Sequence, residues 1–138
     1  MEIKLWDTAG QERFKNLTYQ FYKNADGIII AFDLTNSESF QNTKQWLQSI
    51  YKHSQGSVVK TYCGNKSDLL EVTQDYVQDE AANKIASEHQ MQYFKTSAYK
   101  GENIEEMINY TIREVFEKKL KPKIEEEKLN ESKASQPI

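Results

Sequence analysis

Three short polar loops hold the residues of this sequence whose types and spacing suit chemistry. Each follows a segment expected to be a strand, and in chain order they read DTAGQ (residues 7–11), NKSD (65–68) and TSA (96–98). The Asp68 carboxylate only accepts hydrogen bonds, so it can receive two parallel bonds from adjacent donors of one ligand. Because ligands of parallel α/β sheets bind outside the carboxyl ends of the strands, these loops form the candidate site.

The apolar segments before these loops predict strands. Residues 1–6 alternate, with Ile3 and Leu5 on one face, which is typical of a strand exposed on one side. Residues 27–32 are continuously apolar and β-branched, which is typical of a parallel strand covered on both faces. Two further strands are expected over 58–63 and 93–96.

Helices are predicted between the strands. Thr35 and Glu38 have the spacing of a capping box, which predicts a helix start at Thr35. A second helix is expected over about 78–88, and a third begins at the N-cap Asn103 and ends before Pro122. Strands alternating with helices indicate an α/β fold with a mostly parallel sheet and flanking helices.

Length, composition and charge exclude several classes of protein. The 138 residues fit one domain, and 38% are hydrophobic. A net charge of −3 argues against nonspecific binding to nucleic acid. The single cysteine, Cys63, cannot make an internal disulfide or a zinc cage, which is consistent with a reducing, cytoplasmic compartment. Residues 121–138, rich in Glu and Lys without an aromatic side chain, are expected to be a disordered charged tail.

The three loops carry a family resemblance. DTAGQ, NKSD and TSA, in that order, resemble the nucleotide-contact motifs of Ras-superfamily small GTPases. The longer strings WDTAGQERF and FYKNADGIIIAFDLTNSESF are similar to the Rab family. The resemblance extends from residue 1 to about residue 120. It implies binding of GTP or GDP with Mg²⁺, and GTP hydrolysis as a molecular switch in intracellular vesicle traffic.

The resemblance implies that the second and third loops bind guanine. Asp68 would accept bonds from guanine N1–H and the exocyclic amine, a pair that adenine does not offer. Asn65 would bond the base edge and tie the loops together, while the Lys66 stem would lie across the ring plane. The Ala98 amide would donate to guanine O6, and Ser97 would hold that loop in shape.

The first loop would lie on the phosphate side of the nucleotide. Asp7 matches the family's magnesium-side carboxylate, which acts through a bound water. Gly10 lacks a Cβ, so its amide could approach a γ-phosphate closely. Gln11 matches the catalytic residue that orients the attacking water. Rab-type effectors and regulators would bind through residues 6–24.

The sequence also departs from the family pattern. Its five glycines never have the spacing of a G-x4-G-K-[ST] phosphate loop. Against that pattern, the first two strands, the first helix and the first switch are missing, so residues 1–120 are expected to be the C-terminal two-thirds of a small GTPase domain. We therefore expect weak or absent nucleotide binding, no GTPase activity of this chain alone, and marginal stability.

The C-terminal region departs from the Rab pattern as well. No cysteine follows Cys63, so no lipid anchor is expected, and endomembrane association would need a complete, lipidated form. The alternative to a GTPase switch is a non-catalytic remnant. Such a remnant would act as a protein-interaction fragment through residues 11–24 or the helix over 103–120.

Overall fold

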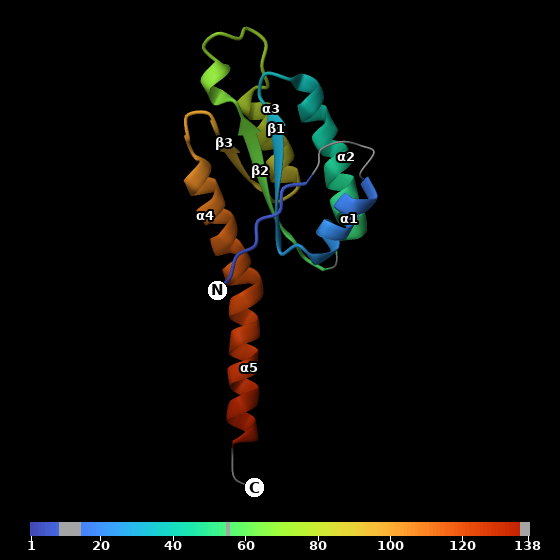
Figure 1. Ribbon diagram of the computed structural model, residues 1–138, viewed down its shortest axis with the longest axis vertical. Coiled ribbons are helices and arrows are strands. Elements are labelled where there is room, and N and C mark those ends of the chain that lie inside the picture. The colour runs from blue at the N-terminus through green and yellow to red at the C-terminus, as the bar shows by residue number, and fades with distance from the viewer. Residues whose placement is uncertain (9–14, 55, 136–138) are drawn as a thin grey trace.

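A computed structural model describes residues 1–8, 15–54 and 56–135 of the chain. Figure 1 shows a small sheet between helices, with one helix projecting away from it. The elements are α1 (Lys15–Asn24), β1 (Gly27–Asp33), α2 (Ser37–His53), β2 (Val59–Asn65), the 3-10 helix η2 (Ser67–Leu69), α3 (Asp79–Glu88), β3 (Gln92–Lys95), α4 (Ile104–Val115), the π-helical segment η3 (Phe116–Leu120) and α5 (Lys121–Ala134).

The described strands form a parallel sheet in the order β1-β2-β3. Asp33 and Asn65, the last residues of β1 and β2, are partners in the register, and Gly64 is paired with Lys95 at the end of β3. Their carboxyl ends therefore meet at one edge. In Figure 1 this edge and the loops after β2 and β3 lie opposite to α5.

Alternate side chains of β2 face different helices. Tyr62 belongs to the main buried cluster, which includes Leu47 and Ile50 of α2 and Ala82 of α3. Thr61 faces the other way, and its buried hydroxyl bonds that of Thr111 in α4 at 2.8 Å. Both faces of β2 are thus covered, and four of its residues in succession, 61–64, are buried. The α/β fold with a parallel sheet and flanking helices is confirmed.

The strand predicted over residues 1–6 is not present. These residues have no regular secondary structure and form no sheet, and Ile3, Leu5 and Trp6 are 55%, 79% and 65% exposed. Alternation specifies which side chains would share a face, but a strand also needs a neighbour for its backbone hydrogen bonds. Within the described residues, the segment has no such neighbour.

The predicted cap at Thr35 is wrong, and the predicted N-cap Asn103 has the right position but makes no side-chain cap bond. The N-cap of α2 is Asn36, whose Oδ1 accepts from Ser39 N at 3.1 Å, while the Thr35 hydroxyl donates to Asp33 at 2.7 Å. A nearby carboxylate thus competes with capping for the Thr35 hydroxyl. Asn103 does precede α4, but its side chain donates to Lys95 O at 2.9 Å instead of capping the helix.

The helix does not end before Pro122. Lys121 N donates to Phe116 O in a widened π-type turn, and Pro122 falls in the first turn of α5, where its missing N–H costs little. A helix therefore extends to Ala134 where a disordered tail is predicted, and residues 121–135 are all exposed. None of the described helices is long and apolar enough to span a bilayer.

Candidate functional site

Backbone hydrogen bonds join the loops that follow β2 and β3. Thr96 N donates to Gly64 O at 2.8 Å, and Ser67 N donates to Thr96 O at 3.0 Å. Both bonds continue the parallel pairing of β2 and β3 beyond the last paired residues. The NKSD and TSA loops are therefore held side by side by the main chain.

Asn65 ties these loops together through its side chain, the linking role that the sequence predicts for it. Its Oδ1 accepts from the Thr96 hydroxyl at 3.2 Å and from the Ala98 amide at 3.0 Å. Since Thr96 donates to Asn65, the Cys63 thiol 3.2 Å away is left to donate to Thr96. The Ala98 amide thus already has a partner, and a ligand carbonyl would have to share or displace that bond.

Ser97 positions the Asp68 carboxylate. The fully buried Ser97 hydroxyl donates to Asp68 Oδ1 at 2.7 Å and accepts from Lys100 N at 3.1 Å. Among the described residues, Oδ2 of Asp68 has no hydrogen-bond partner. Asp68 is half-buried at the start of η2, so one oxygen is fixed by the protein and the other can accept from a ligand.

Lys66 pairs with a residue that the sequence analysis missed. Its backbone is left-handed (φ 69°), and its ammonium lies 2.8 Å from Asp33 Oδ2 at the end of β1. Partial burial raises the pKa of Asp33, but the bonds from Lys66 and Thr35 outweigh it and leave that pKa below its usual value. The hydrogen bond from Lys66 to Asp33 raises the pKa of the Lys66 ammonium in turn. One feature of the sequence points to this pairing. Asp33 is a polar residue at the carboxyl end of an apolar strand, and Asn65 has the same position at the end of the next strand.

Of the phosphate-side residues, the structure describes Asp7, and it does not bring Asp7 to this site. Asp7 is exposed in the N-terminal segment, and among the described residues no hydrogen bond or ion pair joins it to the loops after β2 and β3. Gly10 and Gln11 lie outside the described residues. Within the ranges 1–8, 15–54 and 56–135, no cluster of three His, Cys, Asp or Glu side chains could hold a metal ion.

The site's geometry agrees with the comparisons to known proteins. Residues 1–117 match the model of the Ras family. Similar curated proteins include the Ras-related protein Rab-13 of Bos taurus, with 38% identity over 84% of this chain and 56% of that protein. Others are RABD2b of Arabidopsis thaliana (42%; 77% and 52% covered) and Rab-8 of Diplobatis ommata (36%; 96% and 61% covered).

The fold, the two joined loops and the match over residues 1–117 define the class, and the chain belongs to the Ras family. Within that family it is a Rab-type small GTPase sequence, as the similarity to Rab-13 and Rab-8 shows. The chain spans a little over half the length of these curated relatives.

Proposed function

We propose that the loops after β2 and β3 bind the guanine base of GTP or GDP. The observation that carries this proposal is the Ser97–Asp68 hydrogen bond, which fixes one carboxylate oxygen at 2.7 Å and directs the carboxylate at the edge of the sheet. A carboxylate held in this way matches the N1–H and amine pair of guanine and leaves adenine without a donor pair.

Asn65 and Lys66 complete the base site. The Asn65 side chain holds the Ala98 loop in place while its amide nitrogen remains suited to donate to a ring nitrogen of the base. The Asp33 carboxylate holds the Lys66 ammonium, so the aliphatic stem of Lys66 would be presented to one face of the ring. Ala98 N would exchange its bond to Asn65 for one to guanine O6.

A titration of the 138-residue chain tests this base specificity. With no phosphate-loop motif in the sequence, we expect millimolar rather than tight binding, because most affinity for nucleotides comes from charge-assisted bonds to phosphate. Amide chemical shifts of residues 65–68 and 96–98 should move with guanosine and not with adenosine. D68N should weaken guanosine binding and favour xanthosine. Equal responses to guanosine and adenosine would contradict the assignment.

The switch function rests on family membership together with the DTAGQ loop. We infer that, with a phosphate-binding part, Gln11 orients the attacking water, Gly10 approaches the γ-phosphate, and Asp7 acts on Mg²⁺ through water. Residues 1–120 would then be the C-terminal two-thirds of a GTPase domain that acts in vesicle traffic at endomembranes. Q11L in such a form should slow GTP hydrolysis and spare GTP binding, and an unchanged rate would exclude that role for Gln11.

Effector and regulator binding is proposed for residues 6–24. The ring centroids of Trp6 and Phe21 lie 5.6 Å apart, and these side chains are 65% and 36% exposed. Exposed aromatic side chains of this size are favoured at protein interfaces. The same observation supports the second candidate, a non-catalytic fragment that binds a protein partner. Micromolar binding of fluorescent GDP by this chain would rule out that second candidate.

A further inference from the structure

The Lys66 ammonium is held by a carboxylate that is itself fixed. Thr35 donates twice to Oδ1 of Asp33, from its amide at 2.8 Å and from its hydroxyl at 2.7 Å. Oδ2 of Asp33 lies 2.8 Å from the Lys66 ammonium. The Asp33 amide donates to the Ser39 hydroxyl at 2.9 Å, which fixes the backbone as well. Asp33 therefore holds the lysine from a set position at the end of β1.

This ion pair borders the proposed base site. Asp33 is the register partner of Asn65, which directly precedes Lys66, and Asp68 follows two residues later. A lysine ammonium beside a nucleotide commonly binds phosphate as a point charge. Here the ammonium already has a partner, so a phosphate would have to compete with the Asp33 carboxylate for it.

The other charges of these loops do not attract a phosphate. Lys95, the last residue of β3, is also paired, with its ammonium 3.2 Å from Asp79 Oδ2. In the NKSD loop and residues 96–102, the charged side chains outside the two ion pairs are those of Asp68, Lys100 and Glu102. Two carboxylates and one ammonium leave these loops negative, and negative charge repels a phosphate dianion.

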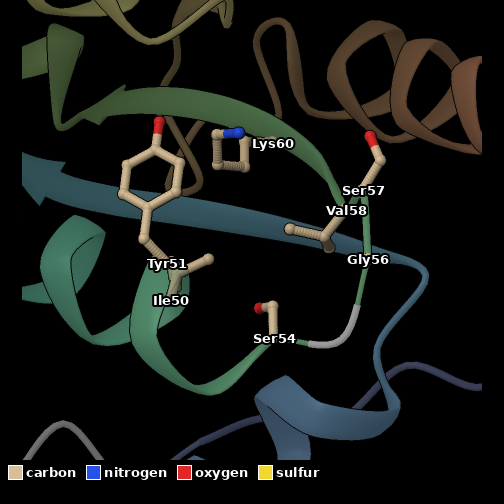
Figure 2. A pocket seen from close by; sticks show the side chains of 7 residues that line it. All are labelled: Ile50, Tyr51, Ser54, Gly56, Ser57, Val58 and Lys60. Atoms are coloured by element: carbon tan, nitrogen blue, oxygen red, sulfur yellow. The ribbon is translucent and has the colours of Figure 1, made fainter.

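The lysine within β2 lies at the other end of the strand. Figure 2 shows Lys60 beside Tyr51, and the Lys60 ammonium is 4.9 Å from the centre of the Tyr51 ring. Lys60 and Asn65 are five residues apart on β2, about 16 Å at 3.3 Å per residue. Lys60 is therefore separate from the base site and provides a matched control for Lys66.

We propose that the base site of this chain selects guanosine over guanine nucleotides, with Asp33 as the specificity-determining residue. Asp33 keeps the Lys66 ammonium from the phosphate of a ligand and adds a negative charge of its own. The aliphatic stem of Lys66 would still lie against the base. The inference rests on the proposed guanine site and specifies its ligand class, an uncharged guanine nucleoside.

Titrations of the 138-residue chain with guanosine and with GMP test this preference, because the two ligands differ only in the phosphate. The amide shifts of residues 65–68 and 96–98 report binding of both. At low salt and neutral pH, GMP should bind about two- to fivefold more weakly than guanosine, since its phosphate carries about two negative charges. The difference should shrink at high salt, which screens charges. Tighter binding of GMP than of guanosine would overturn the proposal.

The variant D33N tests the role of Asp33. It releases the Lys66 ammonium and removes one negative charge, so the affinity for GMP relative to guanosine should rise about threefold. D26N is the control, because it removes the same charge at the other end of β1, where Asp26 is 69% exposed, and it should leave the ratio unchanged. A ratio that D33N does not change, or that D26N raises equally, would contradict this role.

A second substitution shows whether the gain in D33N comes from the lysine. Adding K66M to D33N should return the ratio of GMP to guanosine affinity to near its wild-type value, since no free ammonium remains. Adding K60M instead, which removes the same charge at the other end of β2, should preserve the gain. A gain that survives K66M would show that Asp33 does not act through Lys66.

This inference and the proposed guanine site fail in different ways. If guanosine does not shift the loop amides, the guanine site is wrong and the inference falls with it. If guanosine binds and GMP binds more tightly, the guanine site stands and the preference for the nucleoside is wrong. The wild-type comparison needs no variant, so it decides the preference even if D33N does not fold.

Discussion

The Ser97 hydroxyl donates a 2.7 Å hydrogen bond to Asp68 Oδ1 across 29 positions of the chain. Ser97 is fully buried and its oxygen also accepts from Lys100 N, so both of its bonds have fixed directions. The Asp68 carboxylate is therefore positioned by a different loop from the one that carries it.

Replacing this serine should uncouple the two loops. S97A removes a bond to a charged group, for which we expect a loss of about 1–2 kcal/mol, since water can reach the half-buried Asp68. Guanosine binding should weaken with it, because the carboxylate is no longer held. Urea unfolding and a guanosine titration measure the two effects. S67A, which changes the neighbouring hydroxyl of η2, is the control, and equal losses in the two variants would contradict a special role for Ser97.

The ion pair between Asp33 and Lys66 should make stability depend on pH. The pKa of Asp33 is lowered in the folded chain, so the pair stabilises the fold above the unfolded value of about 4. This stabilisation is lost as the pH falls through the lower, folded value. Because the Lys66 side chain is 51% exposed, we expect this contribution to stability to be small.

The variant D33N isolates this effect. The difference in unfolding free energy between wild type and D33N should be largest near pH 7 and shrink below pH 4. In a K66M background the same substitution should cost less, since the ammonium partner is gone. A difference that stays constant from pH 7 to pH 3 would exclude a contribution from Asp33 ionisation.

Gly64 permits the close packing beneath Asn65. A Cβ at this position would lie 2.8 Å from Tyr93 Oη and 3.0 Å from side-chain atoms of Leu34 and Phe32. G64A should therefore destabilise the chain by roughly 1–3 kcal/mol. In a Y93F background the closest atom is absent, so the same substitution should cost less. Chemical denaturation of the four variants measures this, and an equal cost in both backgrounds would show that Tyr93 is not the obstacle.

Helix α5 should contribute little to the stability of the sheet. Residues 121–135 are all exposed, and Figure 1 shows α5 projecting away from the other elements. Removing residues 121–138 should change the free energy of unfolding by less than about 0.5 kcal/mol while circular dichroism loses helical signal. A loss above about 1 kcal/mol would mean that α5 packs on the sheet.

The edge of β1 predicts marginal stability. β1 pairs only with β2 among the described strands. Ile28 and Ile29 are only half-buried and Ala31 is exposed, and an unpaired edge with exposed apolar residues is typical of a strand that aggregates. We expect concentration-dependent light scattering on heating and fast hydrogen exchange in residues 27–33. A sharp, reversible melting transition with slow exchange in β1 would contradict this.

The sequence predicts the elements that are defined by local pattern. β1, β2 and β3 lie within two residues of their predicted positions, because apolar β-branched runs between polar loops leave few alternatives. Side-chain partners were harder to predict, since they depend on residues distant in the chain. Thr35 bonds Asp33 instead of capping α2, and Asn103 bonds Lys95 O.

In the candidate site, too, the local motifs were predictable and the partners distant in the chain were not. The motifs NKSD and TSA place Asn65, Asp68 and Ser97, and the structure brings those three together. The ion pair of Lys66 with Asp33 required the register of β1 and β2, which sequence alone does not specify. The prediction that the helix ends before Pro122 failed because a π-type turn precedes this proline. The rule that proline ends a helix does not take such a turn into account.

The continuous helix from α4 through α5 has a geometric consequence. Fourteen residues of α5 at 1.5 Å each extend about 21 Å, on the side opposite to the loops that follow β2 and β3. A helix sets both distance and direction, whereas a flexible chain sets only a range of distances. Whatever is attached at Ala134 would therefore be held at a defined separation from the loops after β2 and β3, as on a rigid spacer rather than a tether.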